Sequence, residues 1–175
     1  MVPIGYPSFP EKMYGLSFGG NFKGFDLSVL FQGAANVSVT YSRSFVQPFL
    51  ESRNAPNYMV ESWSYERLIN GQRIRFPRYN TGYSTAAANW VASNWWTRDA
   101  SYVRLKNIEI GYSFPQQLIK KVGLDYLRLY VNGYNLYTWS KVLPGLDPES
   151  APASSVNDDP YPVTRTINFG VNVKF

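Results

Sequence analysis

Apolar and polar residues alternate along five stretches of this chain, which is the pattern of strands that are dry on one face only. In the stretch TINFGVNVKF, for example, Ile167, Phe169, Val171 and Val173 alternate with small or polar residues. The same period of two predicts strands over residues 14–22, 25–39, 101–113, 126–138 and 164–175. The period slips near Lys106–Asn107, where we predict a β-bulge.

The connections between these strands alternate between short and long. A hairpin turn is predicted at 21–24, and a single helical turn is predicted between Pro115 and Gly123. The connections over 40–99 and 140–163 are far longer than usual. Strands of this length, tilted near 45°, span roughly 25–30 Å, and short turns opposite long loops are typical of outer-membrane barrels. The predicted fold class is therefore all-β, with antiparallel transmembrane β-barrel strands and long extracellular loops.

A barrel of this kind gives each face of a strand its own environment. The apolar face lies against lipid and the polar face lines the lumen. The residues predicted to face the lumen are Asp26, Gln32, Arg128, Tyr130, Asn132, Asn168, Asn172 and Lys174. Aromatic residues at the short-turn end are predicted to form an interfacial girdle: Phe22, Phe25, Tyr112, Phe114, Tyr126 and Phe175.

Composition narrows the possible chemistry. The 175 residues include no cysteine and no histidine, which excludes disulfides, thiolate nucleophiles, Cys/His zinc sites and the commonest general base. We find no nucleophile–base pair and no paired carboxylates, so the sequence predicts neither an enzyme nor a cofactor or metal. No apolar run is long enough for a transmembrane helix, and residues 1–15 do not have the pattern of a signal peptide. An export signal is therefore expected elsewhere, in a longer parent chain.

Several features have an alternative interpretation. Trp90, Trp95 and Trp96 are candidates for contact with a substrate or partner, or they pack the long loop against its neighbours. Alternating strands also occur in soluble β-sandwiches, so a secreted carbohydrate-binding module remains the alternative function. Two weaker readings are a single-stranded nucleic-acid site at RIRFPRY and a calcium site in the second long loop. The acidic residues of that loop are Asp147, Glu149, Asp158 and Asp159.

Longer motifs carry a family resemblance. The stretches are YGLSFGGNFKGFDLSVLFQG (14–33), RFPRY (75–79), WTRDASYVRLKNIEIGYSFP (96–115), LRLYVNGYNLYTWS (127–140), GLDPE (145–149) and YPVTRTINFGVNVKF (161–175). In this order they resemble the C-terminal end of the SusC/RagA family of TonB-dependent outer-membrane transporters. Trp96-Thr97-Arg98 is a minor departure from the family pattern, and the stretch around 40–70 is not covered.

The resemblance implies that the chain is the C-terminal part of a large plugged barrel in the cell outer membrane. Such a barrel imports glycans or peptides, works with a SusD-like surface lipoprotein and is energised by TonB through an N-terminal plug that this chain lacks. By the same resemblance, Phe175 would be the signal that the barrel-assembly machinery reads. No nucleic-acid partner is expected. The sequence does not identify the substrate.

Overall fold

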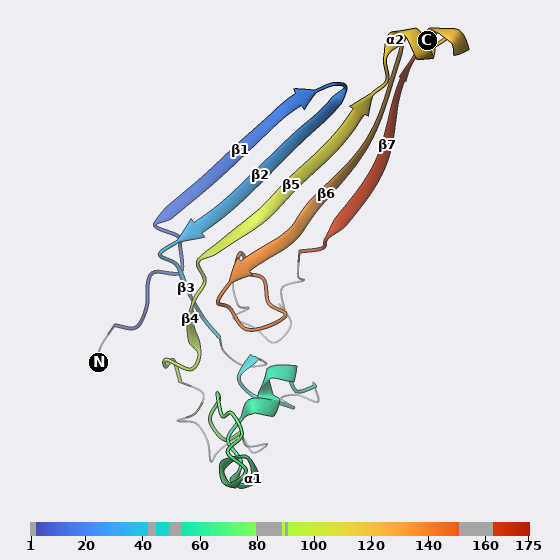
Figure 1. Ribbon diagram of the computed structural model, residues 1–175. Coiled ribbons are helices and arrows are strands. Elements are labelled where there is room, and N and C mark those ends of the chain that lie inside the picture. Colours follow the sequence, from blue (N-terminus) through green and yellow to red (C-terminus); the bar gives the residue numbers. More distant parts are fainter. Residues whose placement is uncertain (1–2, 42–44, 50–53, 80–88, 90, 151–162) are drawn as a thin grey trace. The chain divides into compact units, whose positions relative to one another are not determined.

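The computed structural model describes residues 3–41, 45–49, 54–79, 89, 91–150 and 163–175 (Figure 1). The chain divides into two compact units, which we describe separately. The sheet unit comprises Lys12–Ala34, Tyr102–Ser140 and Val163–Phe175. The loop unit comprises Met1–Glu11, Ala35–Ser101 and Lys141–Pro162. Among the described residues, no helix combines the length and the apolar character needed to cross a bilayer.

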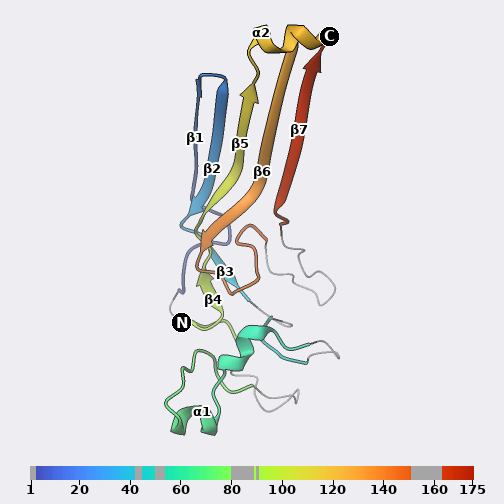
Figure 2. The same ribbon diagram turned by 45° about the vertical axis from the view of Figure 1, so that its right-hand side comes forward.

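The sheet unit is one antiparallel sheet of five long strands. These are β1 (Lys12–Phe22), β2 (Phe25–Ala35), β5 (Tyr102–Ser113), β6 (Tyr126–Ser140) and β7 (Thr166–Lys174). They lie side by side in the order β1-β2-β5-β6-β7, so each strand pairs with its predecessor among these five (Figures 1 and 2). Each of the five strands predicted from the alternation therefore corresponds to a strand of this sheet.

The short connections are turns whose residues suit their backbone. Lys23 and Gly24 both have positive φ, 48° and 89°, as a tight two-residue hairpin turn between β1 and β2 requires. Between β5 and β6 lie α2 (Gln116–Ile119) and the 3₁₀ turn η5 (Lys120–Val122). Pro115 precedes this helical segment, and Gly123 ends it at φ 78°. The helical turn predicted between Pro115 and Gly123 is confirmed.

The predicted bulge is also confirmed. The register between β2 and β5 shifts because Leu30 pairs with Asn107 while Phe31 pairs with Leu105, which leaves Lys106 as an extra residue. Because of this extra residue, Leu105 lies on the same apolar face as Ile108 and Ile110. The matching shift in β6 lies between Tyr134 and Tyr137.

The strand predicted over 25–39 is shorter in the structure. It ends at Ala35 because Asn36 takes the left-handed conformation, with φ 57°, and leaves the ladder. Residues Ser38–Thr40 instead form β3, which pairs with β4 (Thr97–Asp99) in a small two-stranded sheet. The loop unit also contains η3 (Asn57–Glu61) and α1 (Tyr65–Ile69), which the alternation did not predict.

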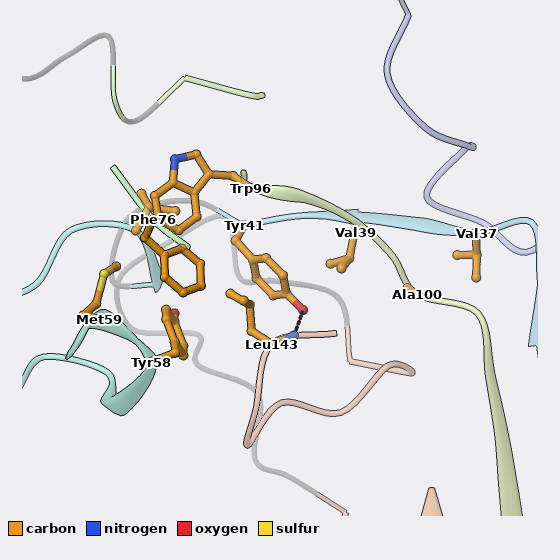
Figure 3. Packing of buried hydrophobic residues seen from close by; sticks show 10 residues of the cluster. Val37, Val39, Tyr41, Tyr58, Met59, Phe76, Trp96, Ala100 and Leu143 are labelled. Carbon is orange, nitrogen blue, oxygen red and sulfur yellow. Dashed lines mark hydrogen bonds between the residues drawn. The ribbon is translucent and has the colours of Figure 1, made fainter. Parts of the chain in front are cut away.

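The loop unit has its own hydrophobic core (Figure 3). Its buried members are Val37, Val39, Tyr41, Val46, Tyr58, Met59, Phe76, Trp96, Ala100 and Leu143. The rings of Phe76 and Trp96 stack with centroids 5.7 Å apart, and Tyr58 packs 5.4 Å from Phe76. Leu143 comes from the second long connection, and its backbone N–H donates to the Tyr41 hydroxyl at 3.4 Å. The two long connections therefore share one core.

Candidate functional site: the two faces of the five-stranded sheet

The strand register gathers the polar side chains of the sheet on one face. Asp26 pairs with Gly111, Glu109 pairs with Asn132, and Asn132 pairs with Asn168, so these positions form rows across neighbouring strands. Alternation then assigns a common set of polar residues to this polar face. The set is Asp26, Ser28, Gln32, Asn107, Glu109, Arg128, Tyr130, Asn132, Asn168, Asn172 and Lys174.

An ion network on the polar face joins three strands. The Arg128 guanidinium donates from Nε to Asp26 Oδ1 at 3.0 Å and from Nη2 to Asp26 Oδ2. Nη2 also donates to Glu109 Oε1 at 2.7 Å. The Arg128 side chain is only 14% exposed, and both carboxylates are less than one third exposed. A planar fork held by two carboxylates has one orientation, so β2, β5 and β6 are fixed relative to one another.

Two glycines make room for the large side chains of this face. A Cβ on Gly111 would collide with the Arg128 guanidinium, and a Cβ on Gly170 would collide with the Tyr130 ring. Each long side chain therefore lies flat across the neighbouring strand. The Arg128 guanidinium also sits 4.9 Å from the centre of the Tyr130 ring, within the range of a cation–π contact.

Two asparagines extend the network to β7, and its donor directions are fixed by chemistry. An ionised Glu109 can only accept hydrogen bonds, so Asn132 turns its amide NH₂ toward it, at 3.4 Å. The Asn132 carbonyl oxygen then accepts from Asn168 Nδ2 at 2.9 Å. One continuous polar network therefore runs from β2 through β5 and β6 to β7.

The opposite face of the sheet is apolar and exposed. On β7 it carries Ile167, Phe169, Val171 and Val173, of which Phe169 is 83% exposed. The other strands add Leu16, Phe18 and Phe22 from β1, Phe25 and Leu27 from β2, Ile110 from β5, and Leu129, Tyr137 and Trp139 from β6. An exposed apolar surface this continuous is rare on monomeric soluble proteins and marks contact with lipid or another apolar surface.

The aromatic residues predicted to form a girdle lie on both faces of the sheet. Phe25 packs 4.6 Å from Tyr112, and Phe114 packs edge-on 5.0 Å from Tyr112, all at the short-turn end. Tyr126 instead shares the polar face with Arg128, because the two are two positions apart on β6, and its hydroxyl lies 3.3 Å from Ser113 Oγ. Tyr126 therefore does not share the apolar face with Phe25 and Tyr112.

All eight residues predicted to face a lumen lie on the polar face. What that face meets stays a prediction. Glu109 was not among the residues predicted to face the lumen, although it occupies a polar position between Ile108 and Ile110. Nor was Arg104, which is 1% exposed and donates from Nε to Thr138 Oγ1 at 2.9 Å. Arg104 was not predicted to face the lumen because the bulge at Lys106 shifts the alternation in this part of β5.

The three tryptophans proposed as contact residues have different surroundings. Trp90 lies outside the described residues. Trp95 is 47% exposed, so its role as a contact residue stays a prediction. Trp96 is 1% exposed, stacks on Phe76 and donates from Nε1 to the Asn89 carbonyl at 2.6 Å. Its burial corrects the contact prediction for Trp96, which packs the loop unit instead.

Three side chains of RIRFPRY make contacts within the loop unit. Arg75 lies 3.3 Å from Glu61, the Arg78 guanidinium lies 6.0 Å from the Trp63 ring, and Phe76 is buried. A single-strand nucleic-acid site needs several exposed aromatic rings beside basic groups. Phe76 is buried, so Tyr79 is the one exposed ring of this segment.

The calcium alternative gains no support from the described part of the second long loop. Asp147 Oδ1 accepts the Glu149 backbone N–H at 2.9 Å, which is ordinary turn chemistry. Asp158 and Asp159 lie outside the described residues. In the part of the chain that the structure describes, no group of three or more acidic residues has the geometry to hold a metal ion.

The β-sandwich alternative lacks its second layer. A sandwich packs two sheets of comparable size face to face. Apart from the five-stranded sheet, the described residues form only the two-stranded β3–β4 sheet, whose strands have three residues each.

Burial perturbs two tyrosines of the loop-unit core. Desolvation raises the pKa of the Tyr58 hydroxyl far above its usual value, and this hydroxyl donates to the Phe45 carbonyl at 2.5 Å. Desolvation likewise raises the pKa of Tyr41, although the hydrogen bond from Leu143 opposes the shift. Both hydroxyls therefore stay neutral in the folded unit at pH values where exposed tyrosines begin to ionise.

Comparison with known proteins gives the chain its family. No family model matches it. It is 30% identical over 182 residues to TonB-dependent receptor P3 of Formosa agariphila, which covers 98% of this chain and 17% of that receptor. It is also 34% identical over 110 residues to TonB-dependent receptor SusC of Bacteroides thetaiotaomicron, which covers 55% of this chain and 10% of SusC.

Solved structures agree with the sequence matches. The RagAB peptide importer in its closed-closed state matches with a TM-score of 0.70 at 22% identity, covering 98% of this chain and 18% of that chain. The open-open state matches with a TM-score of 0.68, also at 22% identity and over 97% of this chain and 18% of that chain. The chain thus spans less than one fifth of the length of these proteins. This likeness confirms the predicted fold class, antiparallel strands of a larger transmembrane barrel. The chain belongs to the SusC/RagA family of TonB-dependent receptors.

Proposed function

We propose that this segment forms part of the wall and outer loops of an outer-membrane importer of glycans or peptides. The observation that carries the proposal is the division of one sheet into a continuous apolar face and a hydrogen-bonded polar face. A sheet of this kind fits a boundary between lipid and a water-filled interior. Lipid cannot form hydrogen bonds with polar groups, and exposure of a large apolar surface to water is unfavourable.

The polar face is proposed to line the interior of the barrel. Arg128 offsets one of the two negative charges of Asp26 and Glu109, and the asparagines continue the hydrogen bonding to β7. A wall with its polar groups satisfied holds its shape while a plug beside it is displaced. In this proposal the plug is supplied by another part of the receptor, and TonB acts through that plug.

The loop unit is proposed to lie outside the cell. Both of its long segments connect sheet strands at the ends opposite the short turns, as extracellular loops of outer-membrane barrels do. Its core draws on both connections, so it offers a preformed surface to a partner. The partner proposed is a SusD-like surface lipoprotein. Trp95, an exposed tryptophan of the loop unit, would contact this partner or the substrate.

The experiment uses the full-length receptor that carries this segment. We expect the receptor to be recovered in the outer-membrane fraction and to need detergent for extraction. Cells with it should take up a labelled peptide or oligosaccharide, and uptake should stop when TonB is deleted. A receptor that is soluble without detergent, or uptake that persists without TonB, would contradict the proposal. Comparing labelled peptides with labelled oligosaccharides then decides the substrate class.

A further inference from the structure

An open apolar hollow of about 410 Å³ lies at the short-turn end of the sheet unit. It is lined by Gly20, Asn21, Phe22, Phe25, Asp26, Leu27 and Ile110. Its size falls within the range of small-ligand sites, and its lining is almost entirely apolar. The inference drawn from it rests on the proposed function, because it needs the apolar face to meet lipid.

A missing side chain creates the hollow. Gly20 falls between Phe18 and Phe22 in the alternation of β1, so its side-chain position points to the apolar face. A Cβ placed on Gly20 would meet no atom within 4 Å. Phe22 and Phe25 stand at the edges, 71% and 57% exposed, and Phe25 is braced against Tyr112 at 4.6 Å.

A positive charge stands beside the hollow. Lys23 follows Phe22 in the hairpin turn, and its ammonium lies 5.2 Å from the centre of the Phe22 ring. The next short connection carries the exposed Lys120, Lys121 and Asp125, none of which lines the hollow. Asp26 is also one of the lining residues, but its carboxylate lies on the opposite, polar face of the sheet, where Arg128 binds it. The positive charge beside the hollow is therefore that of Lys23.

We propose that this hollow binds one anionic phospholipid. An acyl chain lies against Phe22, Phe25 and Leu27, and the Lys23 ammonium binds the headgroup phosphate. The aromatic rings place the hollow at the level where headgroups give way to acyl chains. A lysine near an anionic leaflet gains about 1 kcal/mol, so loss of the Lys23 charge should weaken lipid retention about fivefold.

Two variants test the site without disturbing the fold. Gly20→Phe fills the hollow, and the open space around a Cβ at this position accommodates the added side chain. Lys23→Asn removes the charge, while an Asn-Gly pair keeps the hairpin turn because asparagine tolerates a positive φ. Lys121→Asn is the matched control, since it removes one lysine from the same end but not from the hollow. Each full-length receptor is purified from the membrane and titrated with phosphatidylglycerol or phosphatidylcholine, and bound lipid is counted by native mass spectrometry.

We expect the parent receptor to retain phosphatidylglycerol in preference to phosphatidylcholine. Gly20→Phe and Lys23→Asn should lose this retention at least about fivefold, whereas Lys121→Asn should keep it. Equal retention of both lipids would refute the proposed contact between Lys23 and the anionic headgroup. Full retention by Gly20→Phe would overturn the site and would mean that the hollow is covered, for example by the strand next to β1. A receptor that reaches the outer membrane and imports substrate, yet retains no phosphatidylglycerol, refutes this inference alone.

Discussion

Placing a charge on the apolar face of β7 should destabilise the barrel. Val171 is 58% exposed on that face and pairs with Leu129 of β6. At about 3.3 Å per residue and a tilt near 45°, Val171 lies roughly 7 Å above the strand end at Lys174. An arginine costs about 2–4 kcal/mol at the midplane of a bilayer and about 0–1 kcal/mol near its surface. We therefore expect Val171→Arg to cost about 2 kcal/mol, or about thirtyfold in the folded-to-unfolded ratio.

The assay is urea unfolding of the full-length receptor in phospholipid vesicles, with the fraction that resists unfolding in detergent as a second readout. The matched control is Ser28→Arg, which is also three positions from the short-turn end of its strand. Ser28 lies opposite Glu109 on the polar face, so the new charge gains a carboxylate neighbour. We expect a change within about 0.5 kcal/mol for this control. Equal losses for both variants, or a larger loss for Ser28→Arg, would refute the assignment of the two faces.

Three further predictions concern the ion network and the loop unit. Arg128→Met leaves two carboxylates unpaired beside each other and should lower the free energy of unfolding by about 1–3 kcal/mol, measured in the same vesicles. Trp96→Ala should cost the loop unit about 3–5 kcal/mol and make it sensitive to protease on intact cells, whereas Trp95→Ala should stay within about 0.5 kcal/mol. Because burial raises the pKa of Tyr58 in the folded unit, its contribution to stability is full below about pH 10 and is lost as pH rises toward the folded pKa. Sensitivity of the parent to protease should therefore rise above about pH 10. In Tyr58→Phe the same rise should begin at a higher pH.

The alternation of residues predicted the strands because a two-faced sheet imposes a period of two on the sequence. It also located the bulge, since one extra residue must reverse the parity beyond Lys106. The same rule failed at Asn36, where alternation continues in the sequence although a left-handed residue takes the backbone out of the sheet. Periodicity reports which face a side chain would take, and it does not report whether the strand continues.

The loop unit was harder to predict because its core is not periodic. Trp96, Phe76 and Leu143 come from distant segments and meet only through the tertiary fold, so nothing local distinguishes a buried tryptophan from an exposed one. The ion network shows the same limit. Asp26 and Arg128 could each be assigned to a face, but their contact depends on a register that spans three strands.

The central claim is that one face of this sheet meets lipid and the other meets the interior of the importer. This chain has no cysteine, so Val171→Cys and Asn172→Cys each give it one label site, at neighbouring positions on opposite faces of β7. Any cysteine elsewhere in the full-length receptor is first replaced by serine. Each variant of the full-length receptor is labelled with a fluorophore and placed in vesicles that contain brominated phospholipid. We predict strong quenching of the label at position 171 and little at position 172. Equal quenching at both positions, or stronger quenching at position 172, would contradict the account.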